Sequence, residues 1–297
     1  MNFQLTEEQI AVQMAARDFA KNELLPGVIE RDDQQKFATD QIKKLGELGF
    51  MGMMVDPKYG GSGMDTISYV LAMEEISKVD ASVSVCMSVN NSLVCYGIEK
   101  YANEEQKQKY LVPLASGQKI GAFLLSEPEA GSDATSQRTT AEDKGDYYLL
   151  NGTKNWITNG NSASYYLVIA QTYPEKGHKG INVFIVEKEW AGVTVGAKEN
   201  KMGIRSSDTH SIMFQDVKVP KENILPNVIG LKGPLGCLSS ARFGIAWGAL
   251  GCAMDCYDTA LRYSQQRIQF DKPIGAFQLT QKKLAEMITE ITKGQLM

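Results

Sequence analysis

The hydrophobic period changes twice along this 297-residue chain, and that change limits the folds open to it. Residues 1–118 repeat apolar side chains at helical spacing, as in Ile10 and Met14. Residues 120–220 alternate short β-rich runs with Gly, Asn, Asp and Ser turns, and the helical period returns from about residue 230. Helix, sheet and helix in succession predict an α+β fold.

Three domains are therefore expected. The N-terminal helical domain spans residues 1–118, and a middle antiparallel β domain spans residues 119–222. Residues 223–297 form the first part of a C-terminal helical bundle, which is incomplete in this chain. Because the strands gather in one stretch, the pattern favours a segregated architecture over βαβ units.

Local signals set the ends of several elements. Thr6 with Gln9 matches a capping box, and Gly49 ends a helix that begins at Thr39. The run Asp56–Gly63 is rich in helix breakers and separates this helix from the next. Further helices are predicted over Ile67–Ser77, Ala81–Lys100, Glu104–Ser116 with a cap near Asn103, Leu238–Gln266 and Gln278–Thr292, and strands over Tyr147–Leu150, Tyr165–Ala170, Ile181–Val186 and Ser211–Phe214.

Composition and charge exclude several classes of function. Lys and Arg number 31 against 35 Asp and Glu, and this net charge of −4 argues against a nucleic-acid partner. Two histidines cannot form a histidine-rich metal centre, and five cysteines without a CxxC pair indicate reduced thiols. No apolar run approaches the ~20 residues that cross a bilayer, and the N-terminus does not look like a secretion signal. We expect a cytoplasmic protein with no metal, nucleic-acid or membrane partner.

The segment Phe123–Asp133 begins as a strand and becomes a polar turn that could hold a ligand. Ser126 and Ser132 offer hydroxyl groups, and Gly131 permits close approach of the backbone. The alternative is a β-turn stabilised by Asx-type hydrogen bonds, without a ligand.

A second candidate segment follows the Asn151-Gly152 pair, which is a good hairpin turn. The strand after it carries Trp156 and Thr158, which share one face at a period of two. A flat aromatic wall beside a hydroxyl suits a planar heterocycle. The alternative is that Trp156 fills the core of the sheet.

In order and spacing, LSEPEAGSDA at residues 125–134 and NGTKNWITNG at residues 151–160 resemble the acyl-CoA dehydrogenase family. The resemblance covers essentially the whole chain. Further matches are Tyr59-Gly60-Gly61, Gly63-Met64-Asp65, Glu104–Leu111, Gly203-Ile204-Arg205, Ser207-Asp208-Thr209, Val219-Pro220 and Glu222-Asn223.

The resemblance implies a helical, a β and a second helical domain that bind FAD without a Rossmann fold, and no GxGxxG follows a strand here. It also implies a homodimer or homotetramer with FAD across the subunit interface. The implied cofactor-binding residues are Phe123, Leu125, Ser126, Gly131, Ser132, Trp156, Ile157, Thr158, Arg267, Phe270 and Gln278. The implied substrate-binding residues are Ser132, Ser239 and Arg242.

Within these sets the resemblance assigns particular roles. Trp156 and Thr158 flank the isoalloxazine, with the Thr158 hydroxyl towards the reaction centre of the flavin. Arg267 contacts the FAD pyrophosphate, for which a guanidinium fork is well suited.

The implied reaction is FAD-dependent α,β-dehydrogenation of an acyl-CoA thioester to the trans-2-enoyl-CoA. A glutamate removes the α-proton while the β-hydrogen leaves as hydride to the flavin, and an electron-transfer flavoprotein accepts the electrons. The weakly acidic α-proton requires hydrogen bonds that polarise the thioester carbonyl. The glutamate requires a pKa raised by burial.

The two parts of the chain resemble different subfamilies. Residues 1 to about 223 resemble short-chain acyl-CoA dehydrogenases, and residues from about 225 resemble glutaryl-CoA dehydrogenases. A divergent relative, a natural recombinant and a joining artefact near residue 224 all remain compatible with this pattern. Glutaryl enzymes pair an arginine with the distal carboxylate, and Ser84 stands at that position here. We therefore expect a short neutral acyl chain.

No catalytic base is found in the sequence. The resemblance places the glutamate beyond Met297, or at the position of Ala241, which carries no carboxylate. Glu286 and Glu290, four residues apart on a helix, could be proposed as substitute bases, but their spacing favours a solvated face. We expect a chain without its catalytic segment. The alternatives are a truncated or silent acyl-CoA-binding relative and glutaryl-CoA dehydrogenase-like activity.

Two positions depart from the family pattern at turns. Asp271 follows Phe270 where the family usually has glycine, and Ser206 also replaces a glycine. Each turn is expected to need a positive φ, which aspartate tolerates better than most residues.

Overall fold

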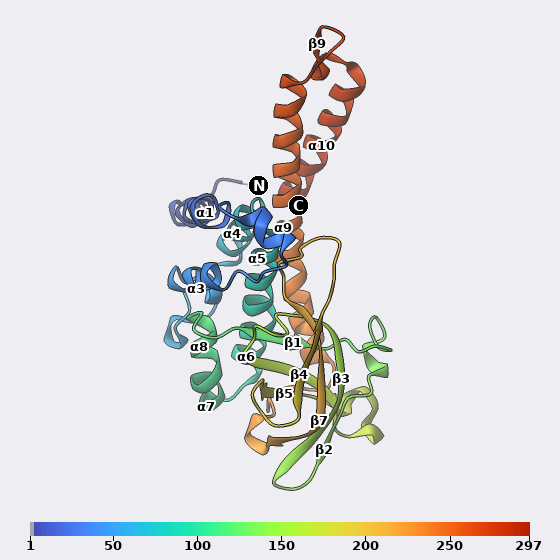
Figure 1. Cartoon of the computed structure of the whole chain (residues 1–297). Coiled ribbons are helices and arrows are strands. Elements are labelled where there is room, and N and C mark those ends of the chain that lie inside the picture. Colours follow the sequence, from blue (N-terminus) through green and yellow to red (C-terminus); the bar gives the residue numbers. More distant parts are fainter. Residues whose placement is uncertain (1–2) are drawn as a thin grey trace.

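The computed structural model describes residues 3–297, and Figure 1 shows their arrangement in three parts. Helices fill one side, a curled sheet lies below and beside them, and the long helix α9 runs past both. This arrangement confirms the α+β fold. The N-terminal helices are α1 (Glu7–Phe19), α2 (Val28–Asp33), α3 (Thr39–Glu47), α4 (Thr66–Ser77), α5 (Ala81–Ser88), α6 (Tyr96–Tyr101), α7 (Glu104–Gln106) and α8 (Val112–Ala115).

The predicted helix ends agree with the local chemistry. Thr6 Oγ1 accepts the Gln9 amide at 3.2 Å and Gln9 Oε1 accepts the Thr6 amide at 3.0 Å, so the capping box is present. Asn103 and Gln106 form the same box at the start of α7. Gly49 has a φ of +76° just after α3, as expected of a glycine that ends a helix.

Helix α5 continues through a π-helical stretch (Val89–Cys95) into α6. By length and composition alone, this helix, Ala81–Tyr101, could cross a membrane. The expectation that no apolar stretch approaches that length was therefore wrong. However, 78% of its apolar window is buried within the protein, as in the core helix of a globular domain.

The sheet has the order β1-β4-β2-β3-β7-β6, with β5 paired to β4. Most pairings are antiparallel, as predicted, but β1 and β2 both run parallel to β4. Parallel pairing needs a long crossover, and the β2–β3 hairpin between β1 and β4 provides it. The strands are β1 (Gly121–Leu124), β2 (Thr140–Asp143), β3 (Tyr147–Thr158), β4 (Tyr165–Gln171), β5 (Ile181–Glu187), β6 (Val193–Lys198) and β7 (Thr209–Pro220).

The predicted hairpin at Asn151-Gly152 is wrong, because both residues lie inside β3. The turn before β3 instead contains Gly145, whose φ is +89°. Gly152 has a φ of +147°, and a Cβ added there would come within 2.7 Å of the Thr139 Cα. Glycine therefore serves close packing inside the sheet at this position.

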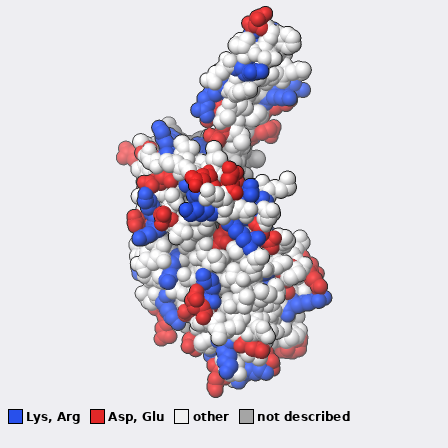
Figure 2. All heavy atoms as spheres, in the orientation of Figure 1, with Lys and Arg blue, Asp and Glu red and all other residues white. Residues whose placement is uncertain are grey.

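The third part is a helical hairpin that projects beyond the body of the molecule (Figure 1). Helix α9 (Lys232–Gln266) and helix α10 (Gln278–Leu296) are joined by the short strands β8 (Ile268–Gln269) and β9 (Lys272–Pro273). On the face that Figure 2 shows, basic and acidic side chains are interspersed over the body and the hairpin.

A positive φ was expected at the two turns where Asp271 and Ser206 replace a glycine of the family, and the structure bears this out at one of the two positions. Asp271 has a φ of +60°, and Phe270 beside it has a φ of +53°, so this turn does need positive angles. Among the described non-glycine residues of the other turn, Ile204 (φ +45°) and not Ser206 takes the positive angle. The strain falls two residues before the missing glycine.

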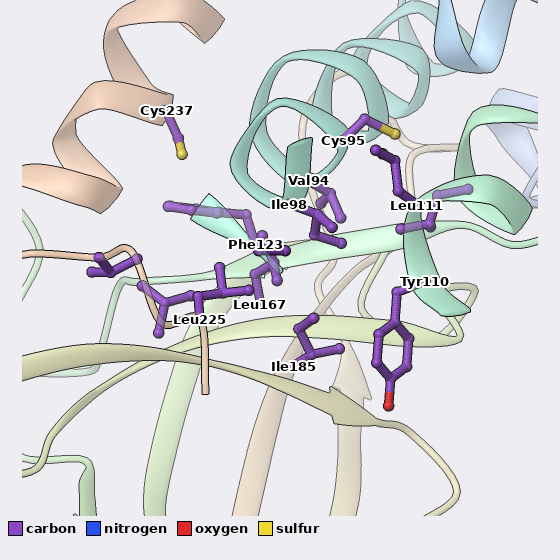
Figure 3. Close-up of a cluster of buried hydrophobic side chains, with 14 of the residues drawn as sticks. Val94, Cys95, Ile98, Tyr110, Leu111, Phe123, Leu167, Ile185, Leu225 and Cys237 are labelled. Atoms are coloured by element: carbon purple, nitrogen blue, oxygen red, sulfur yellow. The ribbon is translucent and has the colours of Figure 1, made fainter. Parts of the chain in front are cut away.

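A core at the junction of the three parts fixes their relative positions (Figure 3). Val94 and Ile98 from the helices meet Phe123 and Leu167 from the sheet, and Cys237 of α9 closes the cluster. Strand β1, which leads into the candidate ligand loop, is therefore anchored by apolar burial on its helical side.

Gly251→Ala is expected to destabilise the protein by about 1–3 kcal/mol, because α9 packs too closely on α4 for a methyl group. An added Cβ would lie 2.2 Å from the Glu74 carbonyl oxygen, and backbone cannot rotate away. Chemical denaturation measures the change. Gly236→Ala on the same helix is the control, since its Cβ meets only the Tyr101 hydroxyl at 3.0 Å. Equal stability of the two variants would contradict the prediction.

Candidate functional site

The loop that follows β1 passes from the core to the surface. Leu125 is buried, Ser126 is half-buried, and Gly131 and Ser132 are exposed. A Cβ added to Gly131 would meet no heavy atom of the described chain within 4 Å, so the outer half of the loop is open. The loop therefore exposes the Ser132 side chain and the Gly131 backbone, with Ser126 half-buried at its root.

Strand β3 contains a bulge that aims Trp156 outward. The pairing with β7 shifts between Lys154 and Ile157, which leaves an extra residue on β3. Trp156 has a φ of +62°, rare for a bulky residue, and its side chain is 62% exposed. Ile157 is buried and Thr158 is half-buried. The alternative that Trp156 fills the core is thus wrong.

Backbone contacts bring the loop and the bulge together. Asn155 directly precedes Trp156, and its backbone amide donates to the Ser126 carbonyl oxygen at 2.9 Å. At the loop's own base, Glu127 and Ala130 exchange backbone hydrogen bonds of 3.0 and 3.2 Å. The two segments singled out in the sequence are therefore joined by a backbone hydrogen bond and lie side by side.

Beneath the loop and the bulge lies an ion pair that the sequence analysis did not predict. The Lys154 side chain has no exposed area, and its Nζ lies 2.8 Å from Glu127 Oε1. The alternation of β3 was the available signal, because buried Tyr148 and Leu150 put Lys154 on the same inward phase. A lysine at that phase needs a buried partner, and the loop provides it.

Both members of the pair are charged at neutral pH. Burial opposes ionisation of Glu127, but the Lys154 ammonium and the backbone amides of Thr139 and Arg138 hold the pKa of the carboxyl below its usual range. Burial lowers the pKa of Lys154 to about 8, against the attraction of Glu127. Three acceptors surround Nζ, as the three protons of an ammonium require.

A second buried pair holds the far side of the bulge. His210 Nε2 lies 2.5 Å from Asp208 Oδ1, and His210 Nδ1 lies 2.8 Å from the Gly196 carbonyl oxygen. Asp208 Oδ2 accepts the backbone amides of Asn161 and Ser162. The strand is thus fixed on both sides of Trp156.

The implied cofactor residues of the third part lie elsewhere. Arg267, Phe270 and Gln278 are exposed at the end of the α9–α10 hairpin, well away from the sheet (Figure 1). Phe270 packs edge-on against Phe277 with ring centroids 6.2 Å apart. Within one copy of the chain, these three residues do not reach the loop Ser126–Ser132 and the Trp156 bulge, which together are called the Trp156 surface below.

The implied substrate residues lie on different elements. Ser239 and Arg242 are exposed on α9, and Ser132 is exposed on the loop. The Ser239 hydroxyl donates to the Leu235 carbonyl at 3.1 Å. Ala241, at the alternative position of the base, is buried.

Neither surface carboxylates nor metal ligands supply a further site. Glu286 and Glu290 are exposed on α10, as expected of a solvated face. Within residues 3–297, no group of three or more His, Cys, Asp or Glu side chains could hold a metal ion.

Family models for the N-terminal, middle and C-terminal domains of acyl-CoA dehydrogenases match residues 6–118, 122–217 and 230–297. The chain belongs to the acyl-CoA dehydrogenase family. The short-chain-specific acyl-CoA dehydrogenase of Clostridium acetobutylicum is 42% identical over 99% of this chain and 78% of its own length. This family is FAD-dependent.

Solved structures show the same fold at high similarity. Butyryl-CoA dehydrogenase of Megasphaera elsdenii is 44% identical, with a TM-score of 0.95 over 99% of this chain and 78% of its own. A glutaryl-CoA dehydrogenase of Mycobacterium smegmatis in complex with FADH2 is 39% identical, with a TM-score of 0.94 over 98% and 74%. A structure described as the electron transferring flavoprotein of Acidaminococcus fermentans holds a chain 44% identical, with a TM-score of 0.96 over 99% and 77%. Both subfamilies named from the sequence are thus similar over nearly the whole chain.

Proposed function

We propose that the chain acts in the FAD-dependent α,β-dehydrogenation of a short-chain acyl-CoA to the trans-2-enoyl-CoA, with an electron-transfer flavoprotein as acceptor. The observation that carries this proposal is the Trp156 bulge joined to the Ser126–Ser132 loop. An exposed indole beside an open, hydroxyl-bearing loop fits a flavin ring with a polar tail. FAD, when bound, supplies the acceptor for the two electrons of the reaction.

We assign the residues of this surface as follows. Trp156 and Thr158 flank the ring system, and Leu125, Ser126, Gly131 and Ser132 contact the cofactor from the loop, Ser132 also facing the acyl-CoA. Phe123 and Ile157 belong to the same cofactor-binding set, and their buried side chains lie beneath the two segments. Ser239 and Arg242 contact the substrate from α9. We assign no general base within residues 3–297.

A second copy of the chain completes the proposed cofactor site. Arg267, Phe270 and Gln278 carry exposed side chains at the end of a projecting hairpin, where a neighbouring copy can be reached. A homodimer or homotetramer would bring this tip to the partner's Trp156 surface. We further propose domain boundaries at 118/119 and 222/223 and a cytoplasmic location.

Reconstitution with FAD tests the proposal. We expect the purified chain to retain yellow flavin. Because no general base is assigned within residues 3–297, bleaching of its visible absorbance by butyryl-CoA would support catalysis by the chain itself. Retained flavin without bleaching would favour the rival reading, a silent acyl-CoA-binding relative. Failure to retain flavin under any condition would reject the cofactor assignment itself.

Glutaryl-CoA is expected to bind at least about tenfold more weakly than butyryl-CoA, a difference in binding free energy of about 1.4 kcal/mol. Ser84, at the position of the glutaryl arginine, is 1% exposed and its Oγ lies 2.5 Å from Ser77 Oγ. A serine cannot neutralise a buried carboxylate. Calorimetric titration of the FAD-loaded chain with both thioesters measures the ratio. Equal affinities would favour the glutaryl alternative.

A further inference from the structure

Lys154 stands where the two parts of the proposed flavin surface meet. Its Nζ donates to the Leu125 carbonyl at 3.0 Å, to Glu127 Oε1 at 2.8 Å and to Gln137 Oε1 at 3.1 Å. An ammonium has three protons, so every donor of this buried side chain has a partner. Two of these partners lie at the root of the Ser126–Ser132 loop.

Glu127 carries the connection onward from the loop. Its Oε2 accepts the Arg138 amide at 2.5 Å, and its Oε1 accepts the Thr139 amide at 3.1 Å. Glu127 thus ties the loop to the segment that enters β2. Because both charges are buried, removal of either partner leaves the other uncompensated.

The backbone beside Lys154 is strained. Trp156, two residues later, holds a φ of +62° in the bulge. Such a conformation persists only where surrounding contacts fix it. On this side of the bulge, those contacts are the three bonds of Lys154 and the Asn155 amide to the Ser126 carbonyl.

We propose that Lys154 is a positioning residue that holds the Ser126–Ser132 loop and the Trp156 bulge in the one arrangement that binds FAD. It acts through Leu125 and Glu127 and does not touch the cofactor. This inference rests on the proposed function, because it assigns the FAD surface to these two segments.

Three variants separate positioning from general stability. Lys154→Met removes the ammonium, and E127Q/K154M removes both charges while the single side-chain oxygen of Gln can still accept the Arg138 amide. The matched control is R31M/D80N, which neutralises another buried ion pair, Arg31 with Asp80 at 3.0 Å in the helical domain. For each variant we measure the melting temperature, the Kd for FAD, the visible circular dichroism of bound flavin, and hydrogen exchange of the flavin-free chain.

The double variant is expected to recover most of the melting temperature that Lys154→Met loses. Its Kd for FAD should nevertheless rise at least about tenfold, with altered flavin dichroism and faster exchange at the Asn155 and loop amides. R31M/D80N should lower the melting temperature and leave the Kd and dichroism unchanged. A wild-type Kd and dichroism in E127Q/K154M would overturn the proposal, because stability alone would then explain the pair.

Two further outcomes are informative. If neither Lys154 variant folds, Gln137→Leu removes only the third contact and should raise the Kd for FAD about threefold, whereas an unchanged value overturns the proposal. If the wild-type chain retains no FAD, the proposed function fails. Hydrogen exchange of the flavin-free chain still tests the anchor in that case, and unchanged exchange in E127Q/K154M would reject it.

Discussion

Replacing Arg31 by methionine should lower the free energy of unfolding by about 3–5 kcal/mol, the range seen when one member of a buried ion pair is removed. Asp80 is 3% exposed, and its Oδ2 lies 3.0 Å from Arg31 Nη2. The other oxygen caps α5 by accepting the Ser82 and Val83 amides. Without Arg31 the carboxylate keeps its cap and loses its counter-charge.

Arg31 also holds the turn before α2, because its guanidinium donates to the Leu24 and Pro26 carbonyl oxygens. Urea denaturation at pH 7 measures the loss. R31M/D80N is the control, since asparagine still caps α5 and no buried charge remains. We expect it to recover a substantial share of the lost stability. A loss below about 1 kcal/mol in the single variant would contradict this account, because that is the range of solvent-exposed pairs.

Local chemistry explains why much of the fold is visible in the sequence. The Thr6 and Asn103 caps depend on residues three apart, and the strands through Tyr165–Ala170 and Ile181–Val186 depend on contiguous β-rich runs. Such signals act within a few residues. The parallel pairing of β1 with β4 depends on partners more than forty positions apart along the chain, and no local pattern encodes it.

The Asn151-Gly152 error shows how tertiary contacts override turn chemistry. Asn-Gly favours a hairpin because both residues accept positive φ. Here the Asn151 side chain instead accepts the Asp216 amide at 2.8 Å, and Gly152 packs on Thr139. The same freedom of glycine serves the interior of β3, and the contacts that decide between these uses come from β2 and β7.

For the candidate site, the sequence motifs selected the residues, whereas only the structure shows which of their side chains face outward. The family resemblance selected Ser126 and Trp156, but period two alone leaves Trp156 on the inward phase of Lys154. The extra residue at the bulge reverses that phase, and burial of Ile157 follows from it. A bulge is set by pairing with β7, so its position could not be derived from β3 alone.

The separation of the hairpin tip from the Trp156 surface leads to the second large expected effect. Arg267→Glu should weaken FAD binding by at least about 2 kcal/mol, or roughly thirtyfold, because it replaces a proposed phosphate partner with a repelling charge. Arg267 is exposed, so little stability is at stake. Arg262→Glu changes an exposed arginine five residues earlier, on α9; it is the matched control and should leave the affinity unchanged.

Mixing two defective chains distinguishes a shared site from a site within one copy. Trp156→Ala damages the sheet part of the proposed site, and Arg267→Glu damages the hairpin tip. If each site combines the sheet of one copy with the tip of the other, a dimer of one chain of each kind has one site with both defects and one site with neither. After unfolding and refolding together, about a quarter of the sites in a two-fold dimer should regain wild-type affinity. If each site used only residues of its own copy, every site in the mixture would remain defective. Recovery of tight FAD binding on mixing therefore requires Arg267 to act on the neighbouring chain.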